Sequence, residues 1–163
     1  MRLFFAAWPP AETAAALHAW SRSLQGRPTP AENIHLTLAF LGEADPLRAA
    51  ASAKRVRGAR HELPIEEARY WKKNEIVWVG PKAMPPELEG LVKALKLELY
   101  RDEFFLERRP FAAHVTLLRK AREPKTLPAL PVVRWPVDEF LLVRSRTTAK
   151  GQLYEPIERY SLG

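Results

Sequence analysis

Two segments far apart in this 163-residue chain repeat one pattern, and the repeat limits the folds that the chain can adopt. Residues 34–38 read Ile-His-Leu-Thr-Leu, and residues 113–117 read Ala-His-Val-Thr-Leu. Alternation of polar and apolar residues is typical of a β-strand with one buried face. Each segment therefore presents a histidine and a threonine on one face and can anchor the other face in a core. We expect two similar α+β halves that bring two equivalent strands together.

The remaining hydrophobic pattern places further strands and three helices around these segments. Expected strands span residues 2–8, 33–41, 62–70, 75–79, 113–119, 137–145 and 154–161, and expected helices span residues 11–24, 46–56 and 85–101. The third helix is the clearest, since leucines and a valine recur there at helical spacing. Gly42 is expected to end the second strand, and Asp45 to cap the helix after it.

The composition is that of a globular protein with a basic surface. Hydrophobic residues make up 47% and charged residues 28%, and 26 Lys and Arg outnumber 19 Asp and Glu to give a formal charge of +7. This charge favours a polyanionic partner such as nucleic acid, although a basic surface kept for solubility explains it equally well. The length suits one well-cored domain, so we expect a single domain over residues 1–163.

Several functional classes are disfavoured. The chain has no cysteine, which excludes disulfides, thiolate zinc sites and a thiol nucleophile. It has no Walker-type phosphate loop, and no carboxylate shares the spacing of the two motif histidines, so neither P-loop chemistry nor a histidine metal site is expected. The apolar run at residues 3–8 is only a strand's length before Pro9-Pro10, so we expect no membrane span and a cytoplasmic location.

These motifs and their flanks resemble the 2H phosphoesterase superfamily, and within it the RNA 2′,3′-cyclic phosphodiesterases, also called 2′-5′ RNA ligases. The resemblance covers essentially the whole chain and rests on Arg2-Leu3-Phe4-Phe5, residues 33–43 (NIHLTLAFLGE), Arg109-Pro110-Phe111, residues 114–119 (HVTLLR) and the strand around Tyr154. It implies two pseudo-symmetric lobes, each an antiparallel sheet with helices on the outside, flanking a central groove. It also implies an enzyme without metal or cofactor that opens an RNA 2′,3′-cyclic phosphate to a 2′-phosphate, with reversible 2′-5′ ligation in some members.

The resemblance assigns a role to each motif residue. His35 is expected to protonate the leaving 3′-oxygen and His114 to activate water, although pseudo-symmetry makes the two nearly interchangeable from the sequence. Two imidazoles on opposite sides of a phosphate can perform both proton transfers near neutral pH. Thr37 and Thr116 would donate hydrogen bonds to the phosphoryl oxygens, and Arg119 would add a charge-assisted one. The alternative interpretation is that the motif residues are ordinary strand residues whose polar atoms contact solvent or backbone groups.

Two residues implied by the resemblance conflict with strict alternation. Arg119 and Phe40 each lie five positions after the histidine of their motif, so alternation puts both on the opposite face. Only a bulge or a bend at the end of the strand would re-aim them. The resemblance places Arg119 on phosphate and Phe40 against a base, while a place in the core is at least as good an interpretation of Phe40. The other histidines, His18 and His61, are expected to be solvated.

Three functions remain open from the sequence. The first is a monomeric, metal-independent RNA cyclic phosphodiesterase that acts on RNA with a 2′,3′-cyclic phosphate terminus and requires no protein partner or membrane. The second applies the same two-histidine chemistry to a small cyclic nucleotide. The third is a non-catalytic RNA-binding module whose histidines only contact phosphate.

Overall fold

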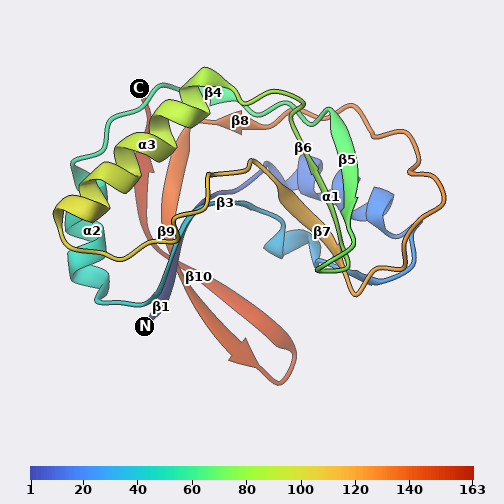
Figure 1. Ribbon diagram of the computed structural model, residues 1–163, viewed down its shortest axis with the longest axis horizontal. Helices are drawn as coiled ribbons and strands as arrows, with labels where there is room; N and C mark the ends of the chain where they lie inside the picture. The colour runs from blue at the N-terminus through green and yellow to red at the C-terminus, as the bar shows by residue number, and fades with distance from the viewer.

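The computed structural model describes residues 1–163 as an α+β fold with two antiparallel four-stranded sheets (Figure 1). The strands are β1 (Arg2–Ala7), β2 (Arg27–Pro28), β3 (Leu36–Glu43), β4 (His61–Glu62), β5 (Glu67–Trp71), β6 (Ile76–Gly80), β7 (Val115–Arg119), β8 (Pro136–Val137), β9 (Glu139–Thr148) and β10 (Gly151–Ser161). The helices are α1 (Ala11–Ser21), α2 (Pro46–Lys54) and α3 (Pro86–Arg101), with a short 3-10 helix η1 (Ala31–Asn33). None of the helices combines the length and apolar character needed to cross a membrane.

The two sheets have the strand orders β10-β9-β1-β3 and β2-β7-β6-β5, and β4 pairs with β8 in a small separate ribbon. Each sheet contains two antiparallel neighbouring strands that are joined in the sequence through a helix. The two units are β1-α1-β3 and β6-α3-β7. This duplicated unit confirms the expected α+β fold with two related lobes. Both motif strands, β3 and β7, belong to it.

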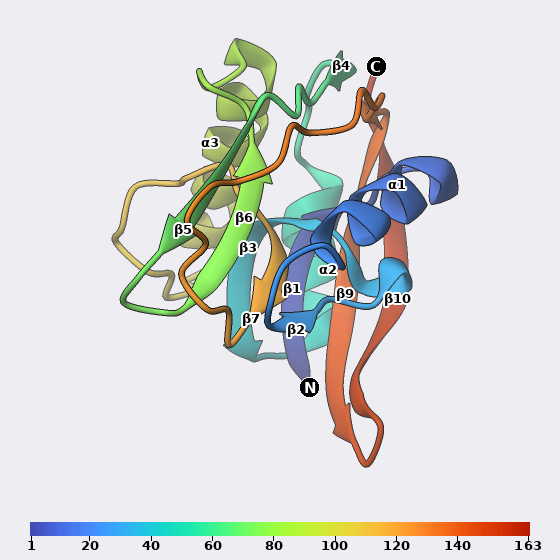
Figure 2. The same cartoon turned by 90° about the vertical axis from the view of Figure 1, so that its right-hand side faces the viewer.

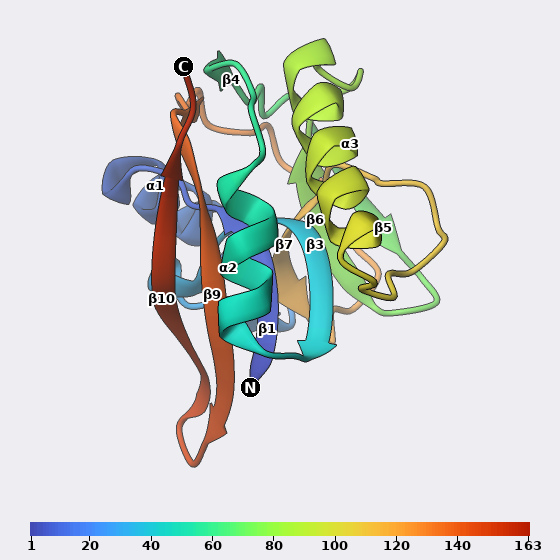
Figure 3. The same ribbon diagram turned by 90° about the vertical axis from the view of Figure 1, so that its left-hand side faces the viewer.

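The helices of the two units are exchanged. Helix α1 packs against β7 and α3 packs against β3, while β3 and β7 lie next to each other (Figure 1). Helix α2 lies beside α3 and also contacts β10 (Figure 3). The helices therefore lie on the outside of the sheets as expected, but each motif strand is covered by the helix of the other unit, which the sequence pattern does not indicate.

One hydrophobic core of 30 buried residues extends from Leu3 to Leu162 and includes residues of both sheets. The predicted stripe of α3 is part of it, and its members are Leu88, Leu91, Val92, Leu95 and Leu99. A second, smaller cluster covers the opposite face of β1 and consists of Phe4, Ala6, Leu141 and Val143. Strand β1 is thus buried on both faces, which makes it the rigid centre of its sheet.

Several predicted boundaries need correction. Helix α1 ends at Ser21, where the hydroxyls of Ser21 and Ser23 donate to carbonyl oxygens of its last turn. Strand β3 passes through Gly42 and ends at Glu43, so Gly42 does not end it. Asp45 caps α2 as expected, since its Oδ1 accepts a hydrogen bond of 2.9 Å from the backbone N–H of Leu47.

Strands β9 and β10 form a hairpin that projects from the body of the molecule (Figure 2). Strand β1 pairs with β9 only at residues 141–144, and the outer part of the hairpin pairs with itself as far as Thr148 and Gly151. Both strands are longer than predicted. Their outer residues are mostly exposed and polar, so they lack the alternation of a half-buried strand that the prediction relied on.

Candidate active site

The two motif histidines are held in the same way, just before their strands begin. His35 Nδ1 lies 2.7 Å from the carbonyl oxygen of Asn33, and His114 Nδ1 lies 2.9 Å from that of Ala112. In each case the ring donates its Nδ1–H to the backbone, which leaves Nε2 as the atom that exchanges protons. His35 Nε2 lies 3.0 Å from Thr37 Oγ1, so the imidazole and hydroxyl of the first motif are in direct contact.

Aromatic side chains surround His35. Its ring stacks on Trp8, with centroids 4.7 Å apart and an interplanar angle of 20°. Phe4 and Tyr154 lie against the same ring, each with a centroid distance of 5.2 Å. These contacts fix the orientation of the imidazole and exclude much of the water that would solvate its charge.

This environment changes the ionisation of His35. Burial is the main cause that lowers the pKa of His35 to about 4; the hydrogen bond to Asn33 acts in the opposite direction, and the guanidinium of Arg119 contributes to the lowering. His35 is therefore neutral at pH 7 in the free protein. The two groups that act on it from the second motif are Arg119, at the end of β7, and His114, just before that strand.

Tryptophan side chains flank His114 as well. The Trp71 ring centroid lies 4.8 Å from that of His114, and the Trp78 centroid lies 6.2 Å away in an edge-on arrangement. Trp71 ends β5 and Trp78 lies on β6, so the second sheet supplies the aromatic wall of the second motif. Both histidines are thus mounted on aromatic side chains of their own sheet.

A β-bulge re-aims the end of β3. Thr37 pairs with Ala6 of β1 and Phe40 pairs with Phe4, and Leu38 between them has no partner in the register. The extra residue shifts the alternation by one, so Phe40 returns to the face of Thr37. Phe40 is 44% exposed, which shows that the interpretation as a core residue is wrong.

A second β-bulge lies in β7 and shifts the alternation of its side chains in the same way. Thr116 pairs with Trp78 of β6, whereas Leu117 has no partner in the register and Leu118 takes the next paired position. The side chain after Leu118 is Arg119, which therefore lies on the face of Thr116. The conflict between Arg119 and strict alternation is removed by this single extra residue.

Thr29, which sequence reasoning missed, binds the β7 bulge from the neighbouring chain segment. Its backbone N–H donates to the carbonyl oxygen of Leu117 at 2.9 Å, and its Oγ1 donates to that of Thr116 at 3.1 Å. His18 Nδ1 in turn lies 2.9 Å from the carbonyl oxygen of Thr29. A lone threonine after a proline gives no signal of this role in the sequence.

The two remaining histidines are not simply solvated. His18 and His61 are both half-buried, and His61 Nδ1 lies 2.9 Å from the carbonyl oxygen of Ala59. The expectation of solvated surface positions was therefore wrong for both. Neither of them lines the pocket between the motif strands that is described below.

Comparison with known proteins identifies the family. Residues 8–78 match the family described as LigT like Phosphoesterase. A protein of Escherichia coli (strain K12) named RNA 2′,3′-cyclic phosphodiesterase is 36% identical over 170 residues, which cover 99% of this chain and 96% of that protein. The chain belongs to the LigT-like phosphoesterase family. A protein of Thermus thermophilus with the same name is 33% identical, covering 99% of this chain and 90% of its own length.

Solved structures agree with the fold of this LigT-like phosphoesterase. The crystal structure of E. coli LigT in apo form superposes with a TM-score of 0.91 at 34% identity and covers 99% of this chain and 96% of its own. The crystal structure of TT0787 of Thermus thermophilus gives a TM-score of 0.83 at 30% identity over 99% and 97% of the two chains. The bilobal α+β fold is thus shared over the full length.

A pocket of about 420 Å³ brings the LigT-like motif residues together. Five of the six residues expected at the site line it, namely Thr37, Phe40, His114, Thr116 and Arg119. The sixth, His35, contacts the pocket residue Thr37 through its Nε2. The volume lies in the range of small-molecule sites. No three His, Asp or Glu side chains are grouped as metal ligands.

Proposed function

We propose that this chain hydrolyses RNA 2′,3′-cyclic phosphate ends to 2′-phosphates by acid–base catalysis with two histidines. The observation that carries the proposal is the meeting of both His-x-Thr motifs and Arg119 at one pocket. The relatives from E. coli and Thermus thermophilus are named for this activity, and they match this chain over 99% of its length.

The two histidines share the proton transfers of one in-line displacement. The oxygen of water forms a bond to phosphorus, and His114 Nε2 accepts the proton that this water loses. The bond between phosphorus and the 3′-oxygen breaks, and His35 Nε2 gives a proton to that oxygen. The products are a 2′-phosphate and a 3′-hydroxyl, and each proton transfer contributes about 10²–10⁴-fold to the rate.

His35 must gain a proton before it can protonate the leaving 3′-oxygen. An imidazole with a pKa of about 4 holds no proton at pH 7 in the free protein. An anionic phosphate close to Nε2 favours the charged imidazolium and raises this pKa. Binding of the substrate therefore supplies the condition under which His35 takes up the proton that it later donates.

The other pocket residues bind the substrate in this proposal. Thr37 and Thr116 donate hydroxyl hydrogen bonds to the phosphoryl oxygens, and Arg119 adds a charge-assisted bond that strengthens as negative charge develops there. Phe40 offers its exposed ring to a nucleobase, and such stacking contributes about 1–3 kcal/mol per base. Its other face is occupied by the guanidinium of Arg2, whose Cζ lies 5.1 Å from the ring centroid.

We also propose the binding partner, the oligomeric state and the cellular location of the protein. The partner is an RNA terminus, and a 5′-hydroxyl that attacks phosphorus in place of water, with the same 3′-oxygen leaving, would give a 2′-5′ link. We propose a monomer that acts as one domain over residues 1–163, because one core includes residues of both sheets. The absence of cysteine is compatible with the cytoplasm, where we place the protein.

The decisive experiment uses an oligonucleotide with a terminal 2′,3′-cyclic phosphate, incubated with the protein in the presence of EDTA. We expect complete conversion to the 2′-phosphate, identified by chromatography against both phosphate isomers. A 3′-phosphate product would contradict the assigned leaving group. Tight, salt-sensitive binding without any product would instead show a non-catalytic RNA-binding module.

A further inference from the structure

The pocket between the motif strands holds more positive charge than a cyclic phosphate requires. Its charged lining consists of Lys96, Arg109, Arg119 and one carboxylate, Glu107. A cyclic phosphodiester carries a single negative charge, which the guanidinium of Arg119 and the threonine hydroxyls can accommodate. Lys96 and Arg109 come from α3 and from the loop after it, and the chemistry at phosphorus gives them no role.

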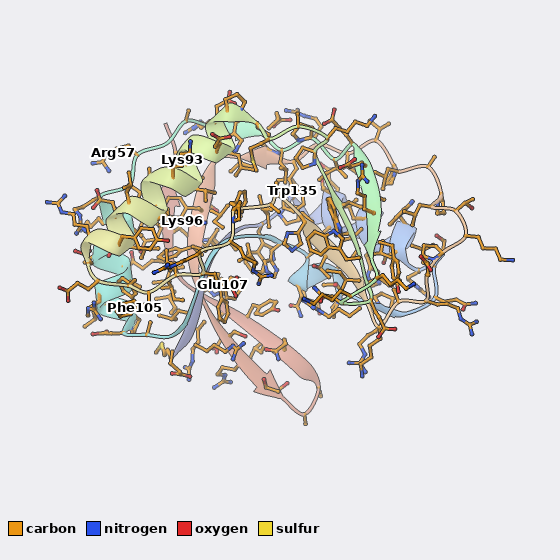
Figure 4. All side chains as sticks on the ribbon, in the orientation of Figure 1. Arg57, Lys93, Lys96, Phe105, Glu107 and Trp135 are labelled. Atoms are coloured by element: carbon orange, nitrogen blue, oxygen red, sulfur yellow. The ribbon has the colours of Figure 1, made fainter.

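Lys96 is free to bind an anion. Its side chain is half-buried, it lines the pocket, and it forms no salt bridge, in contrast to its neighbour Lys93. Lys93 lies three residues earlier on α3 (Figure 4). It is exposed and pairs with Glu89 at 2.9 Å. Partial burial of an unpaired ammonium is unfavourable, so an anion that entered the pocket would be attracted to Lys96.

Arg109 also lines the pocket and lies on the loop that leads from α3 to β7. Its Nη2 pairs with Glu107 at 2.9 Å, but the two side chains are 81% and 69% exposed. Such exposed ion pairs are weak, so a phosphate group can replace the carboxylate. The planar guanidinium then offers two parallel hydrogen bonds to the phosphate oxygens.

We propose that Lys96 and Arg109 form a second phosphate site, which binds the internucleotide phosphodiester on the 5′ side of the terminal nucleotide. This proposal rests on the proposed function and specifies its substrate. The aromatic rings of Phe40 and Phe111 line the same pocket and suit the nucleobase of that nucleotide. The pocket is therefore built for the end of an RNA chain rather than for a free cyclic mononucleotide.

The test compares two dinucleotides that end in a 2′,3′-cyclic phosphate. One has the natural phosphodiester linkage, and the other has a neutral methylphosphonate in its place, so that both keep two bases and the same reactive end. We expect the wild-type protein to prefer the charged dinucleotide by roughly 10- to 100-fold in kcat/KM, as charge-assisted hydrogen bonds would provide. An adenosine 2′,3′-cyclic phosphate without a second nucleotide should react about as slowly as the methylphosphonate.

Two lysine variants distinguish a direct contact of Lys96 with the phosphodiester from the effect of the net charge of the protein. Lys96→Met keeps the unbranched aliphatic chain, and we expect it to lower the ratio of the two kcat/KM values several-fold, while Arg109 retains part of the preference. The matched control is Lys93→Met, which removes an equal charge from the same helix but outside the pocket, and it should keep the wild-type ratio. Thermal unfolding of both variants checks that each is folded.

The outcomes distinguish this site from the proposed function. Equal efficiency of the wild-type protein toward both dinucleotides overturns the second site while leaving the cyclic phosphodiesterase intact. An equal fall of the ratio in both lysine variants also overturns it, because the effect would then come from the net charge. Failure to hydrolyse any of the three cyclic phosphates overturns the proposed function, and the second site with it.

Discussion

The imidazole of His35 stacks on the indole of Trp8, with their centroids 4.7 Å apart. Trp8 directly follows β1, and its Nε1–H donates to the carbonyl oxygen of Glu32 at 3.0 Å, which fixes the indole in place. Because the aromatic wall is rigid, the charged form of His35 gains little solvation from rearrangement of its neighbours. The state of this histidine is therefore governed by residues outside its own motif.

The ionisation of His35 can be measured by NMR titration of its ring protons. We expect a pKa of about 4 in the free protein, from its burial, and a clear rise when inorganic phosphate is bound, since the anion favours the imidazolium. The affinity for phosphate should consequently increase as the pH falls from 7 toward 5. A pKa that stays near 4 with phosphate bound would reverse the roles, leaving His35 as the base and His114 as the acid.

The lowered pKa of His35 also makes the free energy of unfolding depend on pH. The pKa of His35 lies below its unfolded value of 6.5, so between about pH 6.5 and pH 4 the unfolded chain binds more protons. Stability is then unaffected above pH 6.5 and falls as the pH decreases through this window, by up to about 2 kcal/mol at pH 4.5. Urea denaturation at pH 7 and pH 4.5 measures the loss, and His35→Gln should show a smaller one.

Substitution of either motif histidine should abolish most of the turnover. We expect His35→Ala and His114→Ala each to lower kcat by at least about 10²-fold on a cyclic-phosphate oligonucleotide, because each removes one proton transfer. His61→Ala, which changes a half-buried histidine outside the pocket, is the control for general effects of such a substitution. Full turnover by either motif variant would refute two-histidine catalysis, and loss of wild-type activity in EDTA would refute metal independence.

Thr29 should act on catalysis through the β7 bulge. In Thr29→Val the hydroxyl that donates to Thr116 is lost while the side-chain volume is kept, and we expect a loss of about 1 kcal/mol of stability and about tenfold in kcat. Thr29→Ser restores the donor and should restore both quantities. A valine variant with normal kcat would show that the bulge keeps its geometry without this bond.

Gly80, the last residue of β6, lies against the backbone of Ala113, the residue before His114. A Cβ at this position would lie 2.5 Å from the carbonyl oxygen of Ala113, so Gly80→Ala must displace the segment that carries His114. We expect a loss of about 1–3 kcal/mol of stability together with a fall in kcat. The control is Gly90→Ala in α3, where a Cβ meets no atom within 4 Å and should add about 0.5–1 kcal/mol of stability. Normal activity of Gly80→Ala would show that the segment can move without harm.

The duplicated motifs were sufficient to predict the two lobes and the motif strands, because alternation and helical spacing are local properties of the sequence. The positions of Phe40 and Arg119 were not predictable from alternation, because a bulge depends on the partner strand and on groups such as Thr29. The low pKa of His35 could not be inferred either. It arises mainly from burial of the ring, to which Tyr154 and other side chains distant in the sequence contribute only in the folded chain.

The exchange of helices between the two units has a consequence for how the protein is made. Since α1 covers β7 and α3 covers β3, neither unit can hide its own motif strand, and a nascent chain that has released only the first unit exposes it. Tyr154, which completes the wall around His35, lies on β10 and follows both units in the sequence. The surroundings of His35 are therefore complete only after both units and the strand that follows them have been synthesised.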